Sequence, residues 1–68
     1  MDYTRLVFER LHSAGNPDSA TRQQIYQQCR DEISSLVSEP ARALALEILE
    51  KVIRRQEMQA LYEEGHER

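Results

Sequence analysis

Two histidines and one cysteine are the residues best suited to bind a metal or act as a nucleophile: His12, His66 and Cys29. Zinc ligands usually follow spacings such as CxxC, HxxxH or HExxH, and the sequence contains none of these patterns. His12 falls near a predicted helix end, where the helix dipole favours a protonated imidazole. Cys29 falls in an apolar stripe, where a buried thiol packs as a small hydrophobic group. We therefore expect no metal, no cofactor and no catalytic residue.

Neighbouring carboxylates are the second feature with chemical potential, since two carboxyl groups in one cleft can act as general acid and general base. The closest sets are Asp31-Glu32, Glu47 with Glu50, and Glu63-Glu64. These sets fall on polar faces of predicted helices, outside any cleft that would shift their pKa values. Glu47 stands four residues before Lys51, and Glu50 has the same spacing to Arg54, an order that favours ion pairs within a helix. We expect a protein that is not an enzyme and has no small-molecule substrate.

The only concentration of basic residues lies between residues 42 and 55, where they could contact phosphate or an acidic protein: Arg42, Lys51, Arg54 and Arg55. Glutamates lie between them and cancel much of their field. The chain has nine basic and twelve acidic residues, a formal net charge of −3. Because nucleic-acid binding depends on clustered Lys and Arg, we expect no nucleic acid as the main partner. The alternative is a small DNA-binding transcriptional regulator, in which a helix-turn-helix-like unit contacts phosphates through Arg42, Arg54 and Arg55.

Capping residues, glycine and proline divide the chain into three helical segments. Asp2 is a good N-cap for the first, and Gly15 is a typical residue just beyond a helix end. Asp18 or Ser19 can cap the second. Pro40 suits the first turn of the third, because its missing N–H would have no partner there.

The resulting fold class is all-α, a unit of two shorter helices and one long C-terminal helix. The helices are expected over about residues 2–14, 19–37 and 40–63. Together they form a single helical domain over residues 1–64, followed by a frayed tail at 65–68.

The apolar face of the third segment is much broader than that of the second. In the second segment an arc of about 120° is apolar, which suits one neighbouring helix. It contains Ile25, Tyr26, Cys29, Ile33, Leu36 and Val37. Between residues 41 and 53 the apolar arc reaches about 200°, more than one antiparallel neighbour covers. Since 68 residues build a thin core and one cysteine forms no internal disulfide, we expect a partner chain to cover the remainder.

This broad face predicts a non-enzymatic interaction or assembly module. Two occupants are open: a second copy, giving a homodimer and a dimeric helical bundle, or a larger protein on which the chain docks. The residues expected to form the contact are Leu44, Leu46, Ile48, Leu49, Val52 and Ile53.

The expected location is the cytoplasm. No apolar run reaches the length of a membrane-spanning helix, and the N-terminus lacks the pattern of a signal peptide, so no membrane insertion is expected. A single unpaired cysteine fits a reducing compartment.

The stretch from Thr21-Arg22 to Glu57 also carries a recurring arrangement of residues. Its members are Ile25-Tyr26, Arg30, Ile33, Leu46-Glu47, Val52-Ile53-Arg54 and Glu57. This arrangement resembles a pair of helices in uncharacterised alphaproteobacterial proteins. The first helix of that pair carries Ile-Tyr and an Arg, and a short turn follows it. The second helix carries Leu-Glu, Ile-Arg and a Glu. The resemblance covers about half of the chain and implies a bacterial origin, without a catalytic residue to carry over. The chain departs from it by an extra turn between Leu46-Glu47 and Ile53-Arg54.

Overall fold

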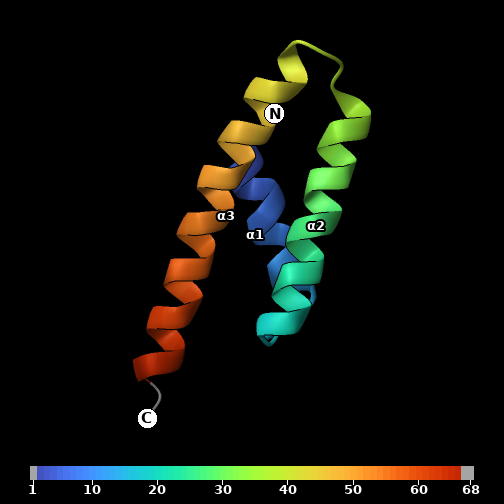
Figure 1. The fold of residues 1–68 in the computed structure, drawn as a ribbon. Coiled ribbons are helices and arrows are strands. Elements are labelled where there is room, and N and C mark those ends of the chain that lie inside the picture. Colours follow the sequence, from blue (N-terminus) through green and yellow to red (C-terminus); the bar gives the residue numbers. More distant parts are fainter. Residues whose placement is uncertain (1, 67–68) are drawn as a thin grey trace.

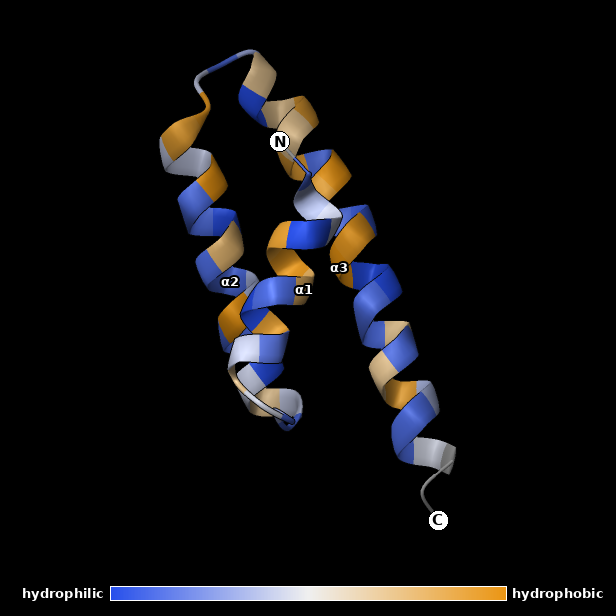
Figure 2. Cartoon of the chain, turned by 180° about the vertical axis from the view of Figure 1, so that it is seen from behind, coloured by the Kyte–Doolittle hydropathy of each residue, from blue (hydrophilic) through white to orange (hydrophobic). Residues whose placement is uncertain are grey.

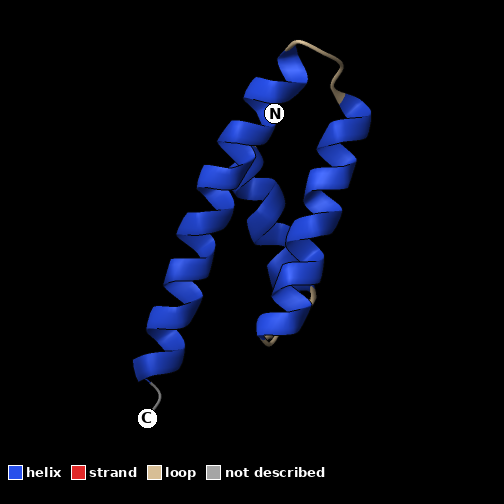
Figure 3. Ribbon diagram, viewed as in Figure 1, coloured by secondary structure: helices blue, strands red, loops and turns tan. Residues whose placement is uncertain are grey.

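The computed structural model describes residues 2–66, and for His66 the backbone alone. It contains three α-helices, α1 (Tyr3–Ser13), α2 (Ser19–Leu36) and α3 (Ala41–His66) (Figure 1). The described part of the chain contains no strand (Figure 3). The all-α, three-helix architecture expected from the sequence is confirmed, and the helix bounds differ from the expected ones by at most three residues.

Short-range hydrogen bonds explain where α1 and α2 begin and where α1 ends. The Asp2 carboxylate accepts a hydrogen bond from the backbone N–H of Arg5 at 3.1 Å, and Asp18 accepts one from Thr21 at 2.8 Å. Gly15 has a φ of 83°, a conformation that a residue with a side chain rarely adopts, and its N–H donates to the carbonyl of His12. The capping roles predicted for Asp2, Gly15 and Asp18 are thus confirmed.

The long helix α3 continues further than expected. Gly65 and His66 are helical, so the fraying expected from residue 65 onward is wrong for these two positions, while residues 67 and 68 lie outside the described range. Two side-chain contacts hold the last turns: Gln59 donates to Glu63 one turn later at 3.1 Å, and Glu64 pairs with a residue of α2. With 26 residues, α3 is about 39 Å long and sets the 45 Å long axis of the molecule.

The three helices pack pairwise around one core. Figure 1 shows α2 and α3 running in opposite directions on either side of their connecting loop, with α1 placed across both. The buried apolar side chains come from all three helices: Val7, Ile25, Tyr26, Cys29, Ile33, Ala45, Leu49 and Ile53. Leu36 differs from the expectation and is exposed, because α2 ends there and Val37 packs against the core instead. Figure 2 shows apolar residues gathered in the first half of α3 and hydrophilic ones toward its C-terminal end.

Candidate interaction site

The structure divides the six residues expected to contact a partner between two faces of α3. Leu49 and Ile53 are 0% and 6% exposed in the single chain and belong to its core. Two more are partly buried against that core: Leu46 and Val52. Leu44 and Ile48 lie on the opposite side and are 61% and 40% exposed. Because both α1 and α2 pack on α3, the chain itself covers much of the broad apolar arc, and of the six only Leu44 and Ile48 present a largely free side chain.

A row of six exposed residues runs along α3 on the side away from the core. Its members are Leu44, Ile48, Lys51, Arg55, Met58 and Tyr62, which we call the α3 stripe. Steps of four and three residues alternate along it, the spacing that keeps side chains in line on a helix. Each end of the stripe is apolar and its middle is basic. At 1.5 Å per residue the stripe is about 27 Å long.

The basic middle of the stripe borders an open surface hollow of about 690 Å³. The hollow is lined by Lys51, Arg54, Arg55, Met58, Gln59 and Tyr62. None of its three cations makes a hydrogen bond or ion pair of 4.0 Å or less within the described range. Every other arginine there is paired with a carboxylate: Arg5, Arg10, Arg22, Arg30 and Arg42. Unpaired positive charge in the described region is therefore concentrated at one place on α3.

Neither ion pair that the spacing favoured within α3, Glu47–Lys51 or Glu50–Arg54, forms within 4.0 Å, and Glu50 pairs with α2 instead. Arg30 of α2 donates to both carboxylate oxygens of Glu50, at 2.7 and 3.0 Å. These hydrogen bonds hold the pKa of Glu50 below its usual value. Arg54, four residues after Glu50, makes no such bond and stays exposed beside the hollow.

Arg42 does not join the other arginines. Its Nε donates to the carbonyl of Val37 at 2.9 Å, and its Nη1 lies 3.9 Å from Glu39. It precedes Arg54 by twelve residues, about 18 Å along the helix. The structure therefore gathers Arg54 and Arg55 with Lys51, and it places Arg42 at the α2–α3 loop.

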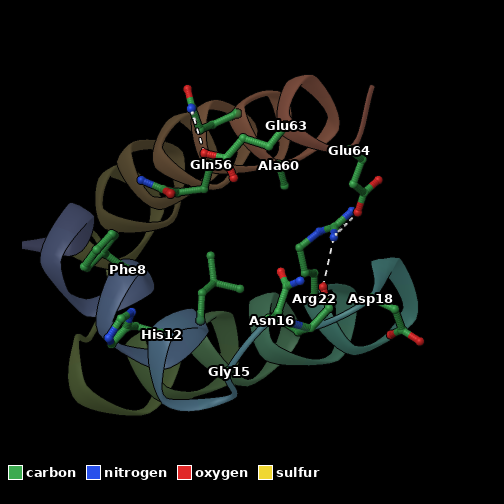
Figure 4. Close-up of a pocket in the computed structure, with 13 residues that line it drawn as sticks. Phe8, His12, Gly15, Asn16, Asp18, Arg22, Gln56, Ala60, Glu63 and Glu64 are labelled. Carbon is green, nitrogen blue, oxygen red and sulfur yellow. Dashed lines mark hydrogen bonds and ion pairs between the residues drawn. The ribbon is translucent and has the colours of Figure 1, made fainter. Parts of the chain in front are cut away.

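A buried arginine cluster holds the second half of α3 against α2. Arg22 is 4% exposed, and its Nε donates to the two oxygens of Glu57 at 2.8 and 3.2 Å. Its Nη1 donates to Glu64 at 2.6 Å and to the carbonyl of Pro17 at 3.1 Å (Figure 4). The Tyr26 hydroxyl donates to Glu57 at 3.3 Å. One guanidinium thus joins α2, α3 and the loop before α2, and so sets the direction in which α3 presents its stripe.

The electrostatics of this cluster favour the charged form of Arg22 and the neutral form of Tyr26. Hydrogen bonding to Glu57 raises the pKa of Arg22, against the opposing effect of burial. Burial, followed by the charge of Glu57, raises the pKa of Tyr26 to about 12. The Nη2 of Arg22 is buried and donates to no group in the described part of the chain. The arrangement is suited to fixing helices rather than to moving protons.

Sequence reasoning did not predict that Arg22 pairs with Glu57 and Glu64, although a signal existed. Arg22 precedes Ile25 by three residues and Tyr26 by four, so it continues the buried stripe of α2. A charged residue at such a position needs a buried counter-ion.

A second hollow, of about 450 Å³, separates the C-terminal half of α3 from α1 and the α1–α2 loop. Figure 4 shows Phe8 and Gln56 at one end and Arg22 with Glu64 at the other. The ring of Phe8 stacks on His12, with the ring centroids 5.8 Å apart, and the imidazole of His12 makes no hydrogen bond within the described range. No nucleophile stands beside a base in this hollow.

The remaining residues with chemical potential lie apart from one another. Cys29 is buried in the core, as expected, and burial raises the pKa of its thiol. Among the described residues, no three His, Cys, Asp or Glu side chains are grouped as a metal site would require. The described helices also include none with the length and apolar character needed to cross a membrane. No family model, curated protein or solved structure matches the chain.

Proposed function

We propose that this protein is a non-enzymatic interaction module that binds another protein chain through the α3 stripe. The observation that carries the proposal is the stripe itself: apolar side chains at both ends of one exposed helix face, with unpaired cations between them. Contiguous exposed apolar residues on a protein surface often mark a site of contact with another protein. The occupant is a second copy, which would give a dimeric bundle, or a segment of a larger protein.

The small core supports this function. Eight apolar side chains are buried in the described part of the single chain, and cores of this size rarely stabilise a fold by more than about 3 to 5 kcal/mol. Burial of Leu44, Ile48 and Met58 against a partner would add to that stability. We place the function in a bacterial cytoplasm, in keeping with the resemblance noted above and with the free buried thiol of Cys29.

Site-specific crosslinking in the host cell tests the proposal. A photoreactive amino acid replaces Leu44 or Met58 in the stripe, and Gln28 on the exposed surface of α2 in a matched control. We expect the two stripe positions to give the same crosslinked protein, and Gln28 to give none. Equal crosslinking from all three positions, or none from the stripe, would contradict the proposal.

A DNA-binding regulator is the second candidate, and the three unpaired cations around the hollow favour it. The engagement of Arg42 with Val37 and the net charge of −3 weigh against it. Anisotropy titration of duplex DNA at several salt concentrations decides between the two. A DNA binder with three phosphate contacts would show a slope of log affinity against log salt of about −2.7. We expect no saturable binding at low salt.

A further inference from the structure

The charge pattern of the α3 stripe identifies the kind of partner that fits it. We infer that the partner segment is an amphipathic helix with apolar residues at both ends and carboxylates in its centre, rather than a second copy of this chain. This inference rests on the proposed function and specifies its occupant.

The geometry of the stripe favours a helix as the partner segment. Alternating steps of four and three residues match the seam along which two helices interlock their side chains. The straight stripe of about 27 Å corresponds to about 18 residues of a partner helix. Leu44 with Ile48 would anchor one end of that helix, and Met58 with Tyr62 the other.

A second copy fits the apolar ends of the stripe but not its centre. In an antiparallel pair centred on residue 53, Leu44 would face Tyr62 and Ile48 would face Met58. Lys51 of each copy would then face Arg55 of the other copy. In a parallel pair, each of these cations would face its own equivalent.

The neighbouring side chains do not relieve that repulsion. Beside the seam of the antiparallel pair, the flanking positions of the two helices meet. There Arg54 would lie opposite Arg54 of the other copy, and Glu47 would lie opposite Leu61 of the other copy. Glu50 and Glu57 are already bonded to Arg30 and Arg22 on the side toward α2. Like charges brought together and partly desolvated oppose association, so the stripe selects against self-pairing.

A partner helix with carboxylates in its centre would neutralise the cations in the middle of the α3 stripe. Lys51, Arg54 and Arg55 make no ion pair of 4.0 Å or less within the described range, where the other arginines are all paired, and Arg54 has only a longer-range attraction to Glu50. Carboxylates opposite Lys51 and Arg55 would form charge-assisted hydrogen bonds that fix the register of the two helices. The apolar ends supply burial and the centre supplies selectivity.

The chain itself provides a probe of the inferred chemistry. The variant K51E/R55E keeps the apolar ends of the stripe and reverses its central charge. Both replaced side chains are exposed and unbonded, so we expect circular dichroism to show an unchanged helix content. If K51E/R55E loses helicity, the single variant R55E takes its place.

We expect wild type and K51E/R55E to form a heterodimer when mixed, while each alone stays monomeric at low micromolar concentration. Native mass spectrometry and sedimentation distinguish the species. The uncharged variant K51Q/R55Q serves as a matched control and should bind wild type at least tenfold more weakly. Salt at 0.5 M should weaken the K51E/R55E complex, since its selectivity is electrostatic.

Two results would overturn the inference, and they separate it from the proposed function. Self-association of wild type as tight as the mixed complex would make a second copy the occupant. Absence of the mixed complex, while crosslinks from positions 44 and 58 still reach one protein, would leave the proposed function standing with a partner of different chemistry. Absence of the mixed complex together with absence of the crosslinks would overturn the proposed function as well.

Discussion

Arg22 contributes more to the architecture than any other single polar side chain in the described range. It is nearly fully buried, and its ion pair with Glu57 joins residues 35 positions apart. Removing one partner of such a pair is costly because the remaining charge stays buried, whereas replacing both by apolar groups is often neutral. The surface pair between Arg5 and Glu9 is a contrasting case, since both side chains are exposed.

Replacing Arg22 by Met should destabilise the chain by about 3 to 5 kcal/mol, comparable to its whole expected stability. The double variant R22M/E57L should recover most of that loss, because no unpaired carboxylate remains beside Tyr26. Arg5→Met, the matched surface control, should cost less than about 0.5 kcal/mol. Urea unfolding followed by circular dichroism measures all three. Equal midpoints for R22M and R5M would show that the cluster is not a stabilising element.

Titration of the Tyr26 hydroxyl makes the free energy of unfolding depend on pH in the alkaline range. Its pKa of about 12 in the folded chain lies above the ordinary value of 10.0, so the unfolded chain loses the proton first. Stability from this hydroxyl is therefore complete below pH 10 and is lost as the pH rises toward 12. We expect the difference in urea midpoint between wild type and Tyr26→Phe to shrink over that window. A difference that stays constant from pH 9 to pH 12 would contradict the assignment.

At the scale of elements, α3 has two faces with opposite roles. The core face carries Leu49 and Ile53, and the outer face carries Leu44 and Ile48. Neighbouring positions on one helix, such as 48 and 49, therefore differ completely in their tolerance of charge. Two ion pairs between helices fix α3 on α2. Arg30 pairs with Glu50, and Arg22 pairs with Glu57 two turns further along α3.

Ile48→Glu should leave the fold intact and remove partner binding, because its side chain lies on the outer face. Leu49→Glu should unfold the chain, since it places a charge in the core and removes a fully covered side chain. Circular dichroism at 25 °C separates the two outcomes, and crosslinking from Met58 reports on binding. Matching helix content in both variants would mean that α1 and α2 do not cover this part of α3.

The Arg30–Glu50 pair should contribute a small, pH-dependent stability. The pKa of Glu50 is lowered in the folded chain, so the contribution is present above its ordinary value of 4.5 and is lost as the pH falls through the lower folded value. Both side chains are partly exposed, which limits the effect to under about 1 kcal/mol. The stability difference between wild type and Glu50→Gln should therefore be measurable at pH 6 and absent at pH 2. A difference that persists at pH 2 would assign it to packing.

At the scale of the whole molecule, one core serves all three helices. Cys29 lies in that core together with Val7 of α1 and Leu49 of α3. Since no helix has a core of its own, loss of any one helix exposes the apolar faces of the other two. We expect cooperative unfolding without a stable two-helix intermediate.

The thiol of Cys29 reports on this cooperativity. It is fully covered and burial raises its pKa, so a thiol reagent reaches it through unfolding. We expect the native chain to react at least about a hundredfold more slowly than the urea-unfolded chain, in line with a stability of about 3 kcal/mol. Equal rates would show that Cys29 is accessible in the native fold.

The three helices, both ends of α1 and the start of α2 follow from the sequence alone, because they depend on contacts over three or four residues. Asp2 with Arg5, Asp18 with Thr21, and Gly15 with His12 are contacts of this kind. The apolar spacing of α2 likewise identified most of its buried face, since helical periodicity is a local property.

Which part of the broad face of α3 remains open follows from the packing of the three helices. That depends on where α1 packs, and it separates Leu49 from Ile48 although they are adjacent in the sequence. The partners of Arg22 and Arg30 lie 35 and 20 residues away, so no local spacing could reveal that they meet. Helix formation follows from neighbours in the chain, whereas the α3 stripe and the cluster that orients it follow from how three helices share one core.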